Sequence, residues 1–495
     1  MNILGIHAGR LASACLAREN HVVGAASQER FDSLKGSDTA PMDVVRWLLA
    51  REGLDETAID CVAISSAPVS LELDIEPEKI RYIDQTTAHA YAPLAFFGAP
   101  QEPTLIFVAD TQSTALYLWD QNKLSPLAHG AGVLGTFYAN VTSALGMAPY
   151  AHEGKVMGLA AYAKEDDFIP VYKKLYAHLW AINEDHLVPV LRQDSNSIAS
   201  PTRFDHMAGA AQHALETTVH EWIRAAIKKT GISRLMTSGG VFTNVRLNKM
   251  IREMPEVTKA QFTPSCGNEM NVFGALYAVA PTLSPIQHLY WGPDYSDQDI
   301  ASFLKAEAQD FAITHCEDIE KRTASLLAKG KIVARFSGRA EFGARSLGNR
   351  AILAHPAQRE AFYQINDQIK LRDFWMPFAP TILDTDADRY LQHAHQAPYM
   401  IDAFDTSEDG QRDLCAAMHP SDKTVRPQIL RYEDNPAYYR LIEAFKAQTG
   451  IGAVMNTSFN LHGHPLVTNL NQALFTLRHS DLRYLAMGSY LIEKR

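Results

Sequence analysis

Three short apolar segments that occur twice constrain the fold of this chain most strongly. Residues 2–7 (NILGIH), 13–18 (SACLAR) and 21–27 (HVVGAAS) predict three strands, with Glu19-Asn20 at the second turn. The pattern returns as TLIFVAD (104–110), TALYLW (114–119) and LSPLAH (124–129), with a DQN turn between the last two segments. Such self-similarity indicates two copies of one structural unit.

Strand-like and helix-like segments alternate along the rest of the chain. LMTSGG (235–240) precedes a helical segment at 244–253, and QFTPSCG (261–267) precedes another at 270–280. Further on, the sequence predicts helices at 299–309, 317–329 and 469–479, and strands at 311–316, 331–336, 451–456 and 484–492. This alternation is typical of the α/β class.

The chain of 495 residues is too long for one hydrophobic core. Prolines and turn formers gather between residues 280 and 299. We therefore expect two domains, over residues 1–285 and 286–495.

Charge and cysteine content exclude several classes of protein. Lys and Arg total 46 against 56 Asp and Glu, a net charge of −10, which argues against a partner that is a nucleic acid or an anionic membrane. The start of the chain does not resemble a signal peptide, and the sequence holds no long apolar run. The five cysteines are scattered without a C-x-x-C pair, so we expect a cytoplasmic protein without a zinc site.

The chemistry is densest in the second half, in four clusters of polar residues. They are SGRAEFGARSLGNR (337–350), NDQIKLRD (366–373), DKTVRPQ (422–428) and MNTSFNLHGHP (455–465). Guanidinium groups bind phosphate or carboxylate through two hydrogen bonds, and glycines let backbone amides approach an anion. An isolated Gly-x-Arg is more often a turn with a salt-bridged arginine, and Glu341 is available as a partner. The four clusters together favour a pocket for a phosphate-bearing substrate.

The segments GRAEFGARSLGNRAIL (338–353), KLRDFWMPFAP (370–380) and NTSFNLHGHPLV (456–467) resemble the carboxy-terminal half of the ATP-dependent O-carbamoyltransferases that modify antibiotics and nodulation factors. The first half is similar through QERFDSLK (28–35), GKVMGLAAY (154–162) and GGVFTN (239–244). The resemblance implies a duplicated actin-like domain of the sugar-kinase type, followed by a YrdC-like α/β domain. It also implies that ATP and carbamoyl phosphate form carbamoyl adenylate in the second domain, and that the carbamoyl group then passes to a hydroxyl of a small-molecule acceptor in the first.

The resemblance carries expectations for individual residues. In the second domain it implies that carbamoyl phosphate and ATP are bound by Arg339, Glu341, Arg345, Asn349, Arg350, Lys370, Arg372, Arg426, Asn456, Ser458 and Asn460. Arg345, Lys370 and Arg372 are expected to be catalytic, and Glu153 and Lys155 either act on the acceptor or form a structural turn. A nucleotide in the first domain would meet Asp110, Gly239, Gly240 and Asn244. ATP and Mg²⁺ are the expected cofactors.

Several departures from the family pattern lie in the first domain. Of a histidine-rich metal motif only His89 remains, with Gln85 in the place of a histidine, and Asn268 replaces an aspartate ligand. A histidine alone binds such a metal poorly, so an iron-type ion is doubtful here and a packed, hydrogen-bonded His89 is favoured. Met376 also replaces an arginine of the second domain.

Three hypotheses follow from these departures. The protein is a carbamoyltransferase whose acceptor domain has no metal or an altered one, or an adenylate-forming enzyme that docks a separate transferase, or a non-catalytic partner. The sequence leaves open the identity of the acceptor, alcohol or amine, and the choice between a homodimer and a complex with a partner transferase.

Overall fold

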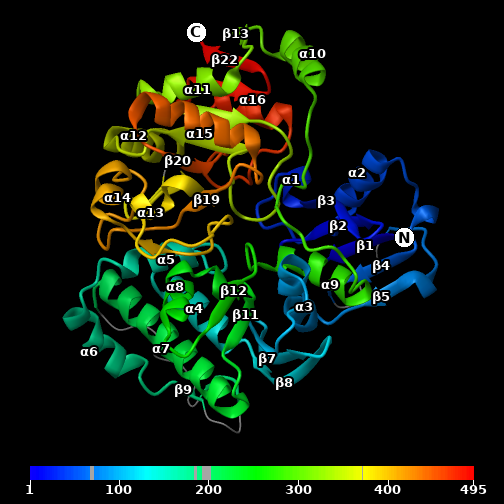
Figure 1. Cartoon of the computed structure of the whole chain (residues 1–495), viewed down its shortest axis with the longest axis vertical. Helices are drawn as coiled ribbons and strands as arrows, with labels where there is room; N and C mark the ends of the chain where they lie inside the picture. Colours follow the sequence, from blue (N-terminus) through cyan, green and yellow to red (C-terminus); the bar gives the residue numbers. More distant parts are fainter. Residues whose placement is uncertain (67–71, 183–186, 192–201, 371) are drawn as a thin grey trace. The chain divides into compact units, whose positions relative to one another are not determined.

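Two five-stranded sheets with one shared topology form the first half of the chain (Figure 1). The computed structural model describes residues 1–66, 72–182, 187–191, 202–370 and 372–495. The first sheet has the order β3-β2-β1-β4-β5, with strands β1 (Asn2–His7), β2 (Ser13–Arg18), β3 (His21–Ser27), β4 (Cys61–Ile64) and β5 (Ile80–Tyr82). The second has the order β8-β7-β6-β11-β12, with β6 (Thr104–Ala109), β7 (Ser113–Asp120), β8 (Lys123–Ala131), β11 (Arg234–Ser238) and β12 (Lys259–Phe262).

Strand directions and turns also agree between the two sheets. Strand β4 runs parallel to β1 and β5, and β11 runs parallel to β6 and β12. Glu19 and Asn20 have φ angles of 49° and 68°, and Gln121 and Asn122 have 49° and 59°. Positive φ at both central residues suits the twist of a two-residue hairpin. The predicted duplication is therefore confirmed.

A helix follows the last strand of each sheet, and these two helices pack against each other. They are α3 (Gln85–Phe97) and α9 (Asn271–Val279). At Gly274 in α9 an added Cβ would lie 1.8 Å from the carbonyl oxygen of Ala88, so the contact requires glycine. The other elements of the first half are α1 (Glu29–Asp32), α2 (Met42–Glu52), α4 (Val133–Ala144), α5 (Glu153–Ala160), α6 (Glu165–Leu175), α7 (Phe204–Thr230), α8 (Val245–Glu253), β9 (Trp180–Ala181) and β10 (Val190–Leu191).

The second half is built on an eight-stranded sheet of order β13-β22-β21-β14-β15-β20-β16-β19. The strands are β13 (Phe311–His315), β14 (Val333–Phe336), β15 (Arg350–Ala354), β16 (Ala379–Leu383), β19 (Gln428–Leu430), β20 (Ala453–Ser458), β21 (Tyr484–Met487) and β22 (Tyr490–Lys494). The helices are α10 (Asp297–Glu307), α11 (Ile319–Ala328), α12 (Arg359–Ile365), α13 (Ala387–Tyr390), α14 (Glu408–Asp413), α15 (Pro436–Thr449) and α16 (Leu470–Arg478). A separate two-stranded antiparallel sheet pairs β17 (Phe404–Asp405) with β18 (Thr424–Val425).

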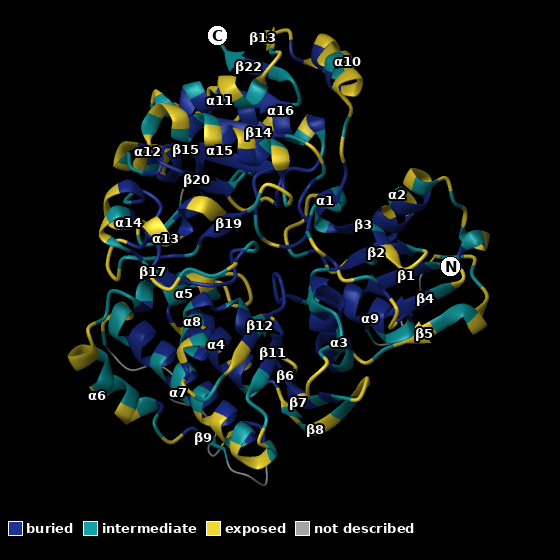
Figure 2. Cartoon of the chain, viewed as in Figure 1, coloured by how far each residue is buried: buried dark blue, intermediate teal, exposed yellow. Residues whose placement is uncertain are grey.

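Both faces of this sheet are covered, and its central strands are buried, whereas the edge strand β13 is largely exposed (Figure 2). Val333 and Leu353 pack into one cluster with residues of α11 and α15, whereas Ala334 and Ile352 pack into another with residues of α10, α12 and α16. Side chains that alternate between two apolar layers explain the nearly continuous hydrophobic strands. The predicted α/β fold class, with a duplicated first half followed by a second α/β region, is confirmed.

The last predicted strand is wrong in one respect. Residues 484–492 form two antiparallel strands, β21 and β22, that reverse at Gly488 and Ser489. Gly488 has a φ of 53°, and an added Cβ would lie 2.5 Å from Oδ1 of Asp297. One glycine within an apolar run therefore marks a tight turn that the hydrophobic pattern concealed.

The chain divides into two compact units that do not follow a single cut of the sequence. Unit 1 holds Met1–Ala8, Cys15–Val22 and Leu54–Ile286, and unit 2 holds Gly9–Ala14, Val23–Gly53 and Gln287–Arg495. The domain boundary between residues 285 and 286 stays a prediction. Among the described residues, no helix combines the length and the apolar character needed to cross a membrane.

Candidate functional site

Three arginines of unit 2 lie close enough for their charges to repel one another. Arg345 lies in the loop between β14 and β15, Arg372 follows the π-helical turn Asn366–Lys370, and Arg426 lies between β18 and β19. Burial, followed by the charges of Arg345 and Arg372, lowers the pKa of Arg426. Burial and the charge of Arg345 lower the pKa of Arg372 to about 10, against the opposing effect of Asp373. An anion bound among these groups would relieve their mutual repulsion.

Lys370 adds a buried ammonium group, only 3% exposed, to this set. Its Nζ donates hydrogen bonds to the carbonyl oxygen and the Oγ of Ser458, the latter at 3.2 Å. It also donates to the carbonyl oxygen of Asn460 at 3.0 Å and to its Oδ1 at 2.5 Å. Burial lowers the pKa of Lys370 well below its usual value, and the charges of Arg372 and Lys35 lower it further. We call Arg345, Lys370, Arg372 and Arg426 the cationic cluster.

The polar residues at the end of β20 connect the cationic cluster to the loop of residues 337–349. Asn456, which is buried, donates from Nδ2 to the carbonyl oxygen of Ser346 at 3.1 Å. Ser458 donates to Oδ1 of Asn460 at 2.6 Å, and Asn460 donates in turn to the carbonyl oxygen of His464 at 2.6 Å. The structure therefore joins Lys370, Ser458 and Asn460 in one network, and Asn456 of the same strand binds the residue that follows Arg345.

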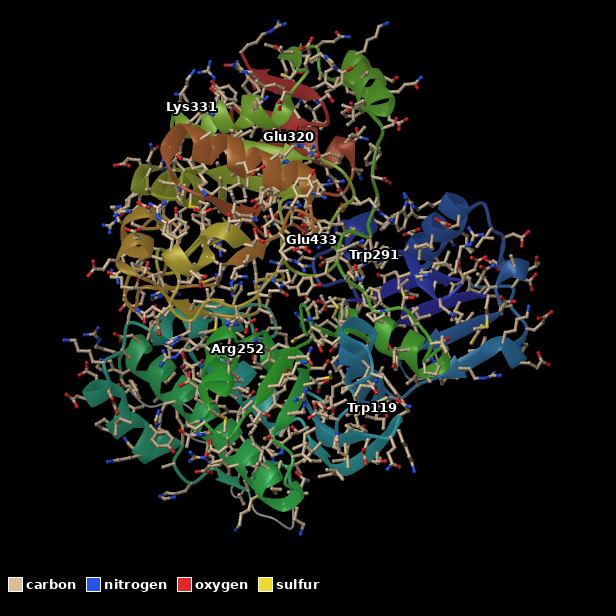
Figure 3. The ribbon with its side chains drawn as sticks, viewed as in Figure 1. Trp119, Arg252, Trp291, Glu320, Lys331 and Glu433 are labelled. Atoms are coloured by element: carbon tan, nitrogen blue, oxygen red, sulfur yellow. The ribbon has the colours of Figure 1, made fainter. Side chains whose placement is uncertain are left out.

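Four other predicted site residues hold the loop in shape. Arg350 is fully buried and donates to the carbonyl oxygens of Ser337, Gly338, Asn349 and Pro293 at 2.8–3.2 Å. Glu341 accepts from the backbone amides of Leu347, Asn349 and Arg350 at 2.7–3.1 Å. Arg339 donates to the carbonyl oxygens of Trp291, labelled in Figure 3, and of Gly292. Asn349 donates to the carbonyl oxygen of Arg339 and accepts from Arg335. The arginine-rich segment thus separates into loop-building residues and Arg345.

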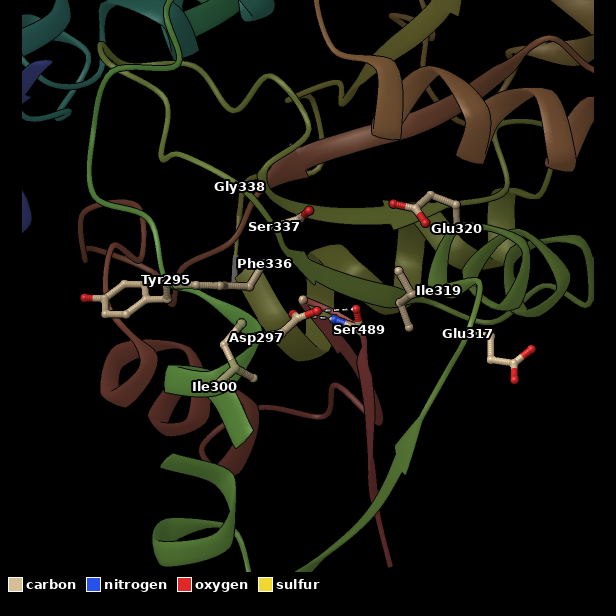
Figure 4. A pocket seen from close by; sticks show the side chains of 11 residues that line it. Tyr295, Asp297, Ile300, Glu317, Ile319, Glu320, Phe336, Ser337, Gly338 and Ser489 are labelled. Atoms are coloured by element: carbon tan, nitrogen blue, oxygen red, sulfur yellow. Dashed lines mark hydrogen bonds between the residues drawn. The ribbon is translucent and has the colours of Figure 1, made fainter. Parts of the chain in front are cut away.

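A cavity of about 230 Å³ lies beside the start of this loop (Figure 4). Its walls include Ser337, Gly338 and the carboxylates of Asp297, Glu317 and Glu320. Asp297 accepts a hydrogen bond from Oγ of Ser489 at 2.6 Å. Because carboxylates repel phosphate, this cavity is unsuited to the triphosphate of ATP, in contrast to the cationic cluster.

In unit 1 the positions of the family's metal motif form a hydrogen-bonded cluster around His89, which is fully buried. Nε2 of His89 lies 3.2 Å from Oδ1 of Asn268, 3.2 Å from Nδ2 of Asn271 and 3.5 Å from Oδ2 of Asp110. Its Nδ1 lies 3.2 Å from Oγ of Ser238. Burial lowers the pKa of His89 and so favours the neutral ring. The charge of Asp110 opposes this shift.

This cluster does not fit an iron-type metal. It offers one imidazole and one carboxylate, and the atoms of His89 that would bind the ion already contact amides and a hydroxyl. Within the described ranges no group of three or more His, Cys, Asp or Glu side chains could hold a metal ion. The residues around His89 therefore give no support for a reaction step that depends on such a metal.

The remaining predicted residues of unit 1 have local structural contacts. Asp110 accepts from the backbone amides of Gln112 and Ser113 at 2.6 Å. Gly239 follows β11 with a φ of 100°, and an added Cβ would lie 2.4 Å from the carbonyl oxygen of Ala109, whereas Gly240 has open space around it. The side chain of Asn244 caps α8 and pairs with Gln212. Glu153 begins α5 and accepts from the backbone amide of Tyr150, with Lys155 half-buried in the same helix.

Sequence reasoning missed two arginines and misplaced one aromatic residue. Arg30 lies in the QERFDSLK motif and donates to the loop of residues 337–349, and Arg335 lies in β14, within the apolar run that predicts this strand. The motif could have indicated Arg30, but its partners are far away in sequence. The aromatic character of the segment FWMPF (374–378) predicts positions in the core, yet Phe374 is 70% exposed beside Arg372.

Comparisons with known proteins identify the family of the chain. The family model described as Carbamoyltransferase N-terminus matches residues 84–276, and Carbamoyltransferase C-terminus matches residues 324–494. An uncharacterized protein of Methanocaldococcus jannaschii is 30% identical over 99% of both chains. The nodulation protein NolNO of Sinorhizobium fredii is 29% identical over 98% of this chain and 79% of its own length. The 3'-hydroxymethylcephem-O-carbamoyltransferase of Streptomyces clavuligerus is 23% identical over 81% of this chain and 78% of its own length. The chain therefore belongs to the carbamoyltransferase family.

Proposed function

We propose that the protein is an ATP-dependent O-carbamoyltransferase that carbamoylates a hydroxyl of a small natural product or sugar. The observation that carries the proposal is the cationic cluster, in which the charges of three guanidinium groups and a buried ammonium act on one another, and the ammonium binds the end of β20. Such a concentration of positive charge suits substrates with several phosphates. Membership of the carbamoyltransferase family supports the choice of carbamoyl phosphate as the donor.

The proposed reaction in unit 2 has two steps. Water cleaves carbamoyl phosphate to carbamate and phosphate, and a carbamate oxygen then attacks the α-phosphorus of ATP and displaces pyrophosphate. Arg345, Arg372 and Arg426 would bind the phosphates and stabilise the negative charge on the pentacovalent phosphorus. Lys370, held by Ser458 and Asn460, would donate to an oxygen of the transferring group. Mg²⁺ would enter with ATP.

The carbamoyl group then leaves the adenylate. The acceptor oxygen forms a bond to the carbamoyl carbon, AMP departs with the electrons of the broken C–O bond, and the acceptor proton passes to a base. We propose Glu153 and Lys155 for contact with the acceptor because they begin a helix of unit 1. The transfer runs without an iron-type metal, in keeping with the amides around His89.

Pyrophosphate release tests the first half of the proposal. Purified protein is stripped of metal, only Mg²⁺ is returned, and pyrophosphate is measured with ATP in the presence and absence of carbamoyl phosphate. Release that depends on carbamoyl phosphate supports the adenylating site. ATP binding without such release would instead identify a non-catalytic nucleotide-binding partner.

The cluster around His89 favours one alternative function. Because amides replace metal-binding groups there, unit 1 is a candidate for a docking module that passes carbamoyl adenylate to a separate transferase. Stoichiometric carbamoylation of an added alcohol or sugar by the protein alone would support the complete transferase. Pyrophosphate release without any carbamoylated product across an acceptor panel would support the alternative.

A further inference from the structure

We propose that Arg30, which is not part of the cationic cluster, is a positioning residue for that cluster. Arg30 lies in α1, near the start of the chain, within the segment Val23–Gly53 that is part of unit 2. The catalytic readout of this inference rests on the proposed function. Its structural part, that one side chain holds two site loops together, does not.

Arg30 donates to one backbone carbonyl in each of two loops. Its Nη2 donates to the carbonyl oxygen of Gly343 at 2.7 Å, and its Nη1 donates to that of Leu466 at 3.3 Å. The side chain is only 5% exposed. A buried charge-assisted hydrogen bond costs more to remove than an exposed one, because the remaining partner loses its hydrogen bond without regaining water.

Both loops carry residues of the cationic cluster or hold them. Gly343, with a φ of 89°, lies two residues before Arg345. A hydrogen bond to its carbonyl therefore fixes the backbone that orients the side chain of Arg345. Leu466 closes the loop that begins at Ser458 and Asn460, which bind the ammonium group of Lys370. The guanidinium of Arg30 therefore holds the backbone of both loops.

The segment around Arg30 is itself held in place. Glu29 lies 3.5 Å from Nη1 of Arg30 and also accepts from the backbone amide of Gly36 at 2.8 Å. From α16, Nε2 of Gln472 donates to the carbonyl oxygen of Arg30 at 3.4 Å and to Oγ of Ser33 at 3.1 Å. These contacts restrict Arg30 to one position, as a residue that orients other groups requires.

Three variants separate a positioning role from a purely structural one. Arg30→Met removes the two donors at similar length, and Arg30→Lys keeps the charge with a single donor group. Arg46→Met is the control, because Arg46 is 60% exposed and pairs with Asp43 on the surface of α2. ATP affinity is measured by calorimetry, turnover by pyrophosphate release, stability by thermal melting, and loop order by hydrogen exchange in residues 340–349 and 460–468.

We expect Arg30→Met to weaken ATP binding or turnover by on the order of 100-fold, the effect of a displacement of about 1 Å. Both loops should exchange faster, Arg30→Lys should restore part of the loss, and Arg46→Met should match the wild type. Wild-type ATP affinity, turnover and loop exchange in Arg30→Met would overturn the inference, as would a loss of stability alone. If Arg30→Met does not fold, Arg30→Lys decides by the same readouts.

Failure of the proposed function has a different signature. It appears in the wild type, as pyrophosphate release that does not respond to carbamoyl phosphate. The titrations with ATP and the exchange of the two loops still test Arg30 in that case.

Discussion

Replacement of Arg426 by methionine should affect stability and anion binding very differently. The structure gives Arg426 a long hydrogen bond, from Nη1 to the carbonyl oxygen of Met400 at 3.3 Å. Its loss costs about 0.5–1.5 kcal/mol. Relief of the repulsion from Arg345 and Arg372 offsets part of this loss. We therefore expect a free energy of unfolding within about 1 kcal/mol of the wild type.

Anion affinity should fall at the same time. A charge-assisted hydrogen bond to a phosphate contributes about 1.5–3 kcal/mol, so the Kd for ATP or pyrophosphate should rise roughly 10- to 150-fold. At a ligand concentration of about 100 times the wild-type Kd, binding stabilises the wild type by about 2.7 kcal/mol. The same concentration should stabilise the variant by only about 0.3–1.4 kcal/mol.

Thermal melting with and without pyrophosphate, together with calorimetric titration, measures both quantities. Arg350→Met is a matched comparison, because Arg350 is a buried arginine of the same unit whose donors hold backbone carbonyls. An Arg426→Met variant that melts well below the wild type but binds pyrophosphate normally would refute our reasoning. It would mean that the cationic cluster is structural.

Three further outcomes follow from the structure. Arg350→Met should lower the free energy of unfolding by about 3 kcal/mol in urea, since several buried carbonyls lose their donor; a change below about 1 kcal/mol would contradict this. Arg345→Ala should abolish pyrophosphate release that depends on carbamoyl phosphate while His89→Ala leaves it intact, and an equal loss in both would undo the assignment of adenylation to unit 2. The lowered pKa of Lys370 should rise when an anion binds, so the protein should take up protons when it binds pyrophosphate at a pH between that pKa and 10.5. Calorimetry in buffers of different ionisation enthalpy measures this uptake. A binding enthalpy that does not depend on the buffer would argue against contact between pyrophosphate and Lys370.

Local patterns predicted the elements of the fold well. The hairpins at Glu19-Asn20 and Gln121-Asn122 follow from residues that tolerate positive φ, and the repeat follows from two similar strand patterns. The final hairpin was missed because Gly488 lies inside an apolar run and its turn depends on α10, which is distant in sequence. Hydrophobic periodicity indicates which residues are buried, but a single glycine does not show whether the chain reverses direction there.

The sequence predicted which residues lie in the candidate site, but it did not predict their separate roles. Arg339, Arg345 and Arg350 occur in similar local sequence, and nothing in it separates them. Their different environments arise from residues 291–293, whose carbonyls accept hydrogen bonds from Arg339 and Arg350. Tertiary packing thus decides which guanidinium group holds the loop and which joins the cationic cluster.

The discontinuous composition of unit 2 has a consequence for synthesis of the chain. Its segment Val23–Gly53 leaves the ribosome early, whereas the partner of Arg30 at Leu466 lies 436 residues later. Contacts of such long sequence separation form slowly and leave apolar surface exposed in the nascent chain. Unit 2 therefore cannot be completed until Leu466 has been translated, and expression of residues 286–495 alone would omit the α1 segment that binds the loop of residues 337–349.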